Sequence, residues 1–84
     1  MTNLDAIIDA TRTFILQEFL QGEDPSALTD DVELFSSGIL DSLATLKLIT
    51  FLEESFKVTI EAHEADEENL NTLTSIANLV SSKL

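Results

Sequence analysis

Apolar residues recur at helical spacing in three separate segments, and this periodicity limits the fold more than any other feature of the chain. The first segment spans residues 4–20, where apolar side chains repeat every three or four positions behind a potential N-cap, Asn3. The second segment begins near Asp41 or Ser42, either of which can cap a helix, and continues to about Phe56. Both segments predict amphipathic helices that bury one face.

The third helical segment begins near Leu73, where Thr72 is the expected N-cap. Between the second and third segments, residues 57–60 alternate like a strand but have no partner run, so we expect an extended linker. Residues 64–70 are expected to form a short helix. The inward-facing stripe predicted for the last helix consists of Leu73, Ile76, Ala77, Val80 and Leu84.

A long connection, residues 21–40, separates the first two helices. Pro25 disfavours helix at the residue before it. Asp30 and Glu33 have the spacing of a capping box, and a single turn there would direct residues 34–35 at the core. The sequence therefore predicts an all-α fold. We expect a four-helix bundle with three main helices, one short helix and a long loop between the first and second helices.

The 84 residues predict a single domain, 1–84, which buries only roughly 60–65% of its unfolded surface. This suffices for a modest core but not for a deep enclosed active site. Sixteen acidic residues against four basic ones give a formal charge of −12, which repels nucleic acid and anionic membranes and attracts basic partners. We therefore expect no nucleic acid and no membrane among the partners.

Few residues could carry catalysis. The chain has no cysteine, and its single histidine, His63, lies in an acid-rich stretch that is typical of a surface. A hydrolytic serine needs a base, and Ser42 is not in a Gly-x-Ser-x-Gly turn. Gly22 and Gly38 are the only glycines, which excludes a glycine-rich phosphate loop, and neither EF-hand nor zinc-ligand spacing is present. We expect no enzyme activity and no metal site.

The segment Gly38-Ile39-Leu40-Asp41-Ser42-Leu43 carries the strongest local signal. In the simplest interpretation, Asp41 or Ser42 is only a helix cap. At 3.6 residues per turn, the core face of the helix that follows holds Leu48, Ile49, Phe51, Leu52 and Phe56. Its expected solvent face holds Leu43, Leu46, Lys47, Thr50, Glu53 and Glu54.

Leu43 and Leu46 are unusual on that solvent face. Two exposed leucines beside a serine at a helix start predict a small apolar contact patch for partners. In the alternative interpretation, the two leucines contact the long loop at Leu34 or Phe35 instead. The residues alone leave both interpretations open.

Three segments together resemble one protein family. Residues 34–43 (LFSSGILDSL), residues 52–60 (LEESFKVTI) and residues 68–72 (ENLNT) are similar, in order and spacing, to acyl and peptidyl carrier proteins. The resemblance implies a four-helix bundle in which a phosphopantetheinyl transferase esterifies Ser42 with 4′-phosphopantetheine from coenzyme A. It also implies that the terminal thiol carries cargo as a thioester and that Asp41 helps to engage the transferase or its metal ion.

On the exposed face of the helix that follows Ser42, we expect the partner contacts to be Leu43, Leu46, Lys47 and Thr50. These partners would be the transferase and the enzymes that load and use the cargo, through basic or apolar docking patches. Fatty-acid carriers usually have acids on the exposed face soon after the serine, where this chain has Ala44 and Lys47. The local sequence is more similar to stand-alone carriers of specialised pathways, including those that hold amino acids.

Two functions from different classes follow. One is the carrier, which we expect to be monomeric and cytoplasmic, because no signal peptide is evident at the N-terminus. The other is an unmodified acidic helical module that binds a basic partner through its charge and its exposed leucines. Phosphopantetheinylation that depends on Ser42 distinguishes the carrier from the module.

Overall fold

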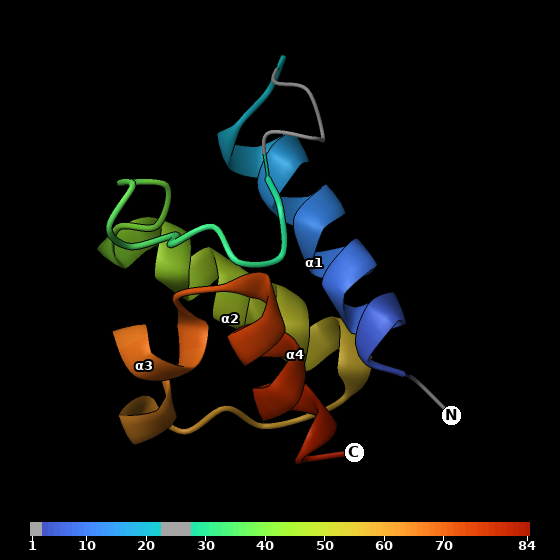
Figure 1. Cartoon of the computed structure of the whole chain (residues 1–84). Coiled ribbons are helices and arrows are strands. Elements are labelled where there is room, and N and C mark those ends of the chain that lie inside the picture. The colour runs from blue at the N-terminus through green and yellow to red at the C-terminus, as the bar shows by residue number, and fades with distance from the viewer. Residues whose placement is uncertain (1–2, 23–27) are drawn as a thin grey trace.

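The computed structural model describes residues 3–22 and 28–84, and all of its regular elements are helices (Figure 1). The predicted all-α fold with three main helices and a short one is confirmed. The expectation for Pro25 lies outside the described residues. The elements are α1 (Leu4–Phe19), α2 (Ser42–Phe56), the 3-10 turn η2 (Ala62–Glu64), α3 (Glu67–Leu70) and α4 (Leu73–Ser81).

Helix α1 begins as its sequence predicts, because the Asn3 side chain accepts a hydrogen bond from the Ala6 N–H at 2.8 Å. Its inward face includes the buried Thr11, whose hydroxyl donates to the Ile7 carbonyl at 2.7 Å. Thr11 is the only buried polar residue in the part of the chain that the structure describes, and this bond satisfies its hydroxyl. Leu4, expected on the apolar stripe, is 41% exposed because it lies in the first turn, beyond the packed region.

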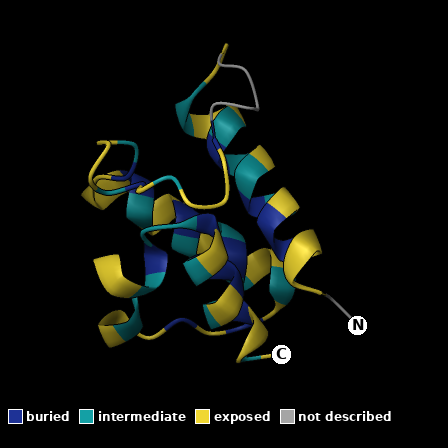
Figure 2. Ribbon diagram, viewed as in Figure 1, coloured by how far each residue is buried: buried dark blue, intermediate teal, exposed yellow. Residues whose placement is uncertain are grey.

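The core lies where α1, α2 and α4 meet. Helix α1 packs against both α2 and α4, and α3 packs against α4 (Figure 1). The buried faces of these helices point inward, and their outer faces are exposed (Figure 2). Leu84 is 58% exposed, so its predicted place on the core stripe is wrong: α4 ends at Ser81, and the helical spacing does not extend past that end. The side chains that are fully buried include Ile7, Ile15, Leu28, Leu34, Leu48, Leu52, Leu70, Leu73, Ile76 and Val80.

The connection before α2 is fixed by hydrogen bonds to the segment around α4 rather than by the expected capping box. Leu34 is buried as predicted, and its N–H donates to the Asn71 carbonyl at 2.6 Å. The next N–H, of Phe35, donates to the Asn71 side chain at 3.0 Å. The Asp30 carboxylate pairs with Arg12 of α1 instead of capping a turn with Glu33. A single turn does follow Glu33, because the Ser37 N–H donates to the Glu33 carbonyl at 3.0 Å, but long-range partners rather than a capping box hold it in place.

The chain leaves α2 through Lys57, whose φ of 58° is left-handed and ends the helix. The extended linker predicted for residues 57–60 therefore does not include Lys57. Residues 58–60 form neither helix nor strand, with Val58 and Ile60 buried and their neighbours exposed. The Ile60 N–H donates to the Glu53 carboxylate at 2.9 Å, so Glu53 is a partly buried acceptor rather than the solvent-facing residue that its helical spacing predicts. This contact fixes the linker against α2.

The short helix expected at residues 64–70 is present as α3, but it begins only at Glu67. The residues before it form the separate 3-10 turn η2, because Glu61 and Asp66 cap the two elements separately. Asp66 is the N-cap of α3 and accepts from the Asn69 N–H at 3.0 Å. Glu64 ends η2 and accepts from the Glu61 N–H at 3.0 Å. Helix α4 begins behind Thr72, as predicted.

Candidate functional site

At the start of α2, two adjacent side chains have different structural roles. Asp41 is the N-cap, and its carboxylate accepts from the Ala44 N–H at 2.8 Å. Ser42 is the first helical residue and is exposed. Among the described residues, nothing forms a hydrogen bond with its hydroxyl. The helix cap is therefore Asp41, and the Ser42 hydroxyl is open to solvent.

The loop before Ser42 is anchored on both sides of a turn. Gly38 has a φ of +83°, a conformation that L side chains rarely adopt, and its N–H donates to the Phe35 carbonyl at 3.1 Å. Two residues later the Leu40 N–H donates to the Leu34 carbonyl at 3.0 Å, and the Leu40 side chain is buried. These contacts fix the backbone just ahead of the serine. An incoming enzyme would meet the hydroxyl in a defined position.

The backbone at this helix start suits a phosphodiester. The Ala44 and Thr45 N–H groups are bonded to Asp41, at 2.8 Å each. Within the described residues, the Ser42 and Leu43 N–H groups have no acceptor. Two free N–H groups at a helix N-terminus favour an anion, so a phosphate on Ser42 would meet donors rather than acceptors. The residues present therefore fit a 4′-phosphopantetheine group on this hydroxyl.

The four predicted contact residues all lie on the outer face of α2. Leu43 and Leu46 are each 63% exposed, so most of each side chain faces solvent, although Leu46 lines a groove together with Phe35 of the long loop. Lys47 and Thr50 are also exposed, and the Thr50 hydroxyl donates to the Leu46 carbonyl at 3.0 Å. Ala44, expected on this face, is only 6% exposed; placing it there was wrong, because its small side chain packs into the core.

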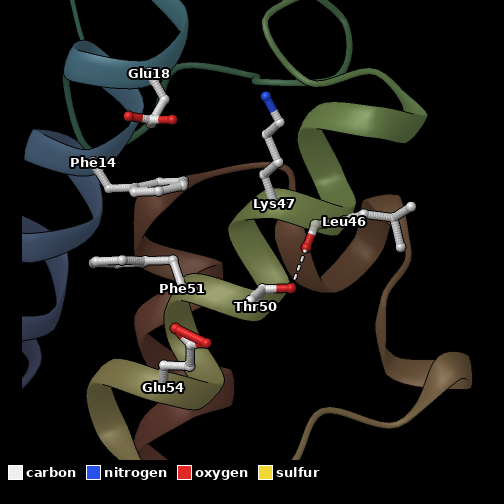
Figure 3. A pocket seen from close by; sticks show the side chains of 7 residues that line it. All are labelled: Phe14, Glu18, Leu46, Lys47, Thr50, Phe51 and Glu54. Atoms are coloured by element: carbon white, nitrogen blue, oxygen red, sulfur yellow. Dashed lines mark hydrogen bonds between the residues drawn. The ribbon is translucent and has the colours of Figure 1, made fainter.

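Two grooves that the sequence did not predict lie on either side of Leu46. The first, of about 590 Å³, begins at Ser42. It is otherwise lined by Phe35, Leu40, Asp41, Thr45, Leu46, Ile49 and Ala65. The second, of about 470 Å³, lies between α1 and α2 (Figure 3). It is lined by Phe14, Glu18, Leu46, Lys47, Thr50, Phe51 and Glu54.

Only part of the second groove can be predicted from the sequence. Phe51 is expected on the core face of its helix, and Phe14 belongs to the apolar repeat of residues 4–20. In the structure their rings stack on each other, with centroids 4.3 Å apart and planes 14° apart. Which helices pair, and in what register, is a tertiary property, so periodicity within one helix cannot reveal the groove.

The remaining candidate groups do not form a second site. His63 is exposed in η2. Its neighbour Glu64 pairs with Lys83 at 2.7 Å, and this hydrogen bond, with the one from the Glu61 N–H, lowers the pKa of Glu64 below its ordinary value. Across residues 3–22 and 28–84, no group of three or more His, Cys, Asp or Glu side chains could hold a metal ion. In the same residues, no helix has the length and apolar character needed to cross a bilayer.

A family model and the curated relatives of this chain point to the same protein family. The family model described as "Phosphopantetheine attachment site" matches residues 14–80. A D-alanyl carrier protein of Lactococcus lactis subsp. cremoris is 37% identical over 70 residues, which cover 83% of this chain and 89% of the relative. The D-alanyl carrier protein of Bacillus velezensis is 36% identical over 64 residues, covering 76% of this chain and 81% of the relative.

One solved structure is also similar. It is described as "Crystal structure of FAD-dependent dehydrogenase", and its matching chain is 28% identical with a TM-score of 0.76. The match covers 83% of this chain and 97% of that one.

Proposed function

The chain belongs to the phosphopantetheine-attachment family of carrier proteins, and from this premise we propose that Ser42 bears the arm and that the cargo is an aminoacyl group. The family match decides between the two functions in favour of the carrier, which holds its cargo on a covalent 4′-phosphopantetheine and is not an enzyme. The observation that supports Ser42 is that its side chain is exposed at the first position of α2 and that its hydroxyl forms no hydrogen bond with any residue the structure describes.

The proposed modification needs a transferase and coenzyme A. The Ser42 oxygen bonds to the phosphorus that bears the pantetheine, the bond from that phosphorus to the bridging pyrophosphate oxygen breaks, and adenosine 3′,5′-bisphosphate leaves. The hydroxyl proton passes to a base of the transferase, because no side chain among the described residues accepts a hydrogen bond from the Ser42 hydroxyl. Asp41 holds the helix start in place while the free Ser42 and Leu43 N–H groups face the new phosphate. The attached arm supplies a thiol that holds the cargo as a thioester.

An aminoacyl cargo is supported by the names of the relatives, which are D-alanyl carrier proteins. It is also supported by the outer face of α2, which has Lys47 one turn after Leu43 where fatty-acid carriers have acids. The partners proposed are the transferase, an adenylating enzyme that loads the amino acid, and the enzymes that use it. Leu43, Leu46, Lys47 and Thr50 are the proposed contacts. We propose a monomer in the cytoplasm, where coenzyme A and ATP are available.

The attachment is tested by intact mass after incubation with coenzyme A and a broad-specificity phosphopantetheinyl transferase. The wild-type protein should gain one phosphopantetheine, and Ser42→Ala should gain none. Ser36→Ala removes an exposed serine from the neighbouring loop and should be modified like the wild type. An adduct that persists in Ser42→Ala, or no adduct with several transferases, would contradict the proposal.

The cargo class is tested on the modified protein. A D-alanine-activating ligase with ATP should convert it to the alanyl thioester, detected by intact mass and reversed by hydroxylamine. An acyl-activating ligase supplied with a short fatty acid is the control and should load it poorly. Efficient fatty-acyl loading with no alanyl loading would contradict the aminoacyl cargo while leaving the attachment at Ser42 intact.

A further inference from the structure

We propose that the groove between α1 and α2 receives the aminoacyl end of the loaded arm, with the ammonium of the cargo bound at Thr50 and Glu54 (Figure 3). This inference rests on the proposed attachment at Ser42. It adds a binding site in the carrier itself for one chemical class of cargo, a small aminoacyl thioester. The groove is open to solvent along its length, so an occupant could leave it when an enzyme docks.

The floor of the groove is aromatic. Phe14 of α1 and Phe51 of α2 stack with centroids 4.3 Å apart, and both are half-buried, so parts of their rings remain accessible. Aromatic rings attract a cation over their faces and accept a small apolar side chain beside it. An aminoacyl group with a short side chain has both a cationic ammonium and a small apolar side chain, whereas a plain acyl chain has no charge.

The polar groups along the rim are in an order that fits this cargo. Lys47, at the end of the groove nearer Ser42, is a donor, and no carboxylate lies within ion-pair distance of it among the described residues. Further along α2, the Thr50 hydroxyl gives its proton to the Leu46 carbonyl and can then only accept. Glu54, one turn beyond, is an acceptor. Along α2, the groove thus presents a donor first and acceptors after it, while its α1 side carries the acceptor Glu18.

In an aminoacyl thioester that extends from Ser42, the acceptor and donor groups follow each other in the order complementary to that of the α2 side chains. Its carbonyl oxygen comes first and is an acceptor, which Lys47 can satisfy. Its α-ammonium comes next and is a donor, which Thr50 and Glu54 can satisfy. Glu18 of α1 lies at the Lys47 end, opposite the proposed ammonium position (Figure 3).

The arm is long enough. At 1.5 Å per residue, Thr50 lies about 12 Å and Glu54 about 18 Å along α2 from Ser42. From phosphorus to sulfur the arm has about 14 chain atoms, which span roughly 16 Å at the reach of an extended backbone. The sulfur can therefore pass Lys47 and bring the cargo to Thr50 without full extension.

The other groove fits this cargo less well. It begins at Ser42 and lies on the opposite side of Leu46, with mostly apolar walls. Its only charged lining residue, Asp41, already uses one carboxylate oxygen to cap α2. Burying an ammonium there would leave it poorly paired. The ammonium of the cargo therefore favours the groove between α1 and α2.

The experiment compares two arms that differ only by the ammonium. A transferase attaches alanyl and propionyl arms to Ser42 from coenzyme A analogues in which an amide replaces the thioester, and intact mass verifies each product. The difference between the amide ¹H–¹⁵N shifts of the two products is then mapped on the chain. We expect the largest differences at Thr50, Phe51 and Glu54, and small ones at Ile49 and Ala65.

Two matched variants test the position of the ammonium. Glu54→Gln should reduce these differences at least twofold, whereas Glu18→Gln removes the same charge from the other end and should leave them nearly unchanged. Both residues are exposed, and unchanged circular dichroism verifies the fold. Differences centred on Ile49 and Ala65, or an equal loss in both variants, would overturn the inference. Failure to form either adduct would contradict the attachment at Ser42 instead.

Discussion

At the scale of single residues, the site depends on which of two adjacent side chains caps α2. Aspartate and serine are both good caps, so the sequence could not distinguish Asp41 from Ser42. The backbone decides: Asp41 is extended, with a ψ of −171°, and its carboxylate reaches the Ala44 N–H. Because the cap is Asp41, Ser42 has no structural task, and its substitution should be harmless to the fold.

Substitutions at these two positions should therefore differ in their effect on stability. Asp41→Ala should lower the free energy of unfolding by about 1 kcal/mol, because a capping bond is lost. Asp41→Asn keeps the cap and Ser42→Ala removes none, so both should stay within about 0.5 kcal/mol of the wild type. Urea unfolding followed by circular dichroism measures all three. Equal destabilisation by Ser42→Ala and Asp41→Ala would contradict the assignment of the cap.

The Asp41→Asn variant also separates capping from enzyme recognition. If Asp41 engages the transferase or its metal ion, as the family resemblance implies, this variant should fold normally and yet be modified several-fold more slowly. An unchanged rate of modification would restrict Asp41 to the cap.

At the scale of elements, the sequence predicted what local patterns control and missed what packing controls. Periodicity and side-chain caps were enough to find α1, α2 and α4. The segment from Glu61 to Leu70 was harder, since short helices have little periodicity and its caps compete. The exposed face of α2 was correct at Leu43 and Leu46 but wrong at Ala44, which lies at the boundary between the faces. Neither groove was predicted, because each is formed by more than one element.

The contact between Glu64 and Lys83 connects η2 to the end of the chain and should make stability depend on pH. The pKa of Glu64 is lowered, mainly by the hydrogen bond from Lys83 and then by the one from the Glu61 N–H. The folded state therefore favours the charged form of Glu64. This contribution is present above the ordinary pKa of a glutamate and is lost as the pH falls through the lowered pKa of Glu64.

The predicted readout is the difference in melting temperature between the wild type and Glu64→Gln. The variant should melt lower at neutral pH, and the difference should shrink in acid, once Glu64 is protonated in the wild type. Glu67→Gln, an exposed acid of the same region, is the control for lost charge and should not show this trend. A difference that is constant across the acid range would contradict a role for the ionised pair.

At the scale of the whole molecule, the charges are unevenly distributed. Two of the four basic residues, Arg12 and Lys83, are held in ion pairs with neighbouring acids. The α2 surface between Ser42 and Phe51 contains Lys47 and no acid, whereas residues 61–68 are rich in acids. A partner that docks over Ser42 would thus meet an apolar surface at α2 and a negative one beside it at η2 and α3. Salt should weaken the second contact more than the first.

The same charge excess should make the fold more stable in salt. With sixteen acids and four basic residues, the chain carries a formal charge of −12, so we expect repulsion among the carboxylates to exceed the attraction within the ion pairs. Raising sodium chloride from ~0.01 M to ~0.15 M shortens the screening length from about 30 Å to about 8 Å. The melting temperature should therefore rise, and it should rise less in a Glu67→Gln, Glu68→Gln double variant, which carries two fewer negative charges. A melting temperature that is unchanged or lower at the higher concentration would mean that the ion pairs of Arg12 and Lys83 outweigh the repulsion.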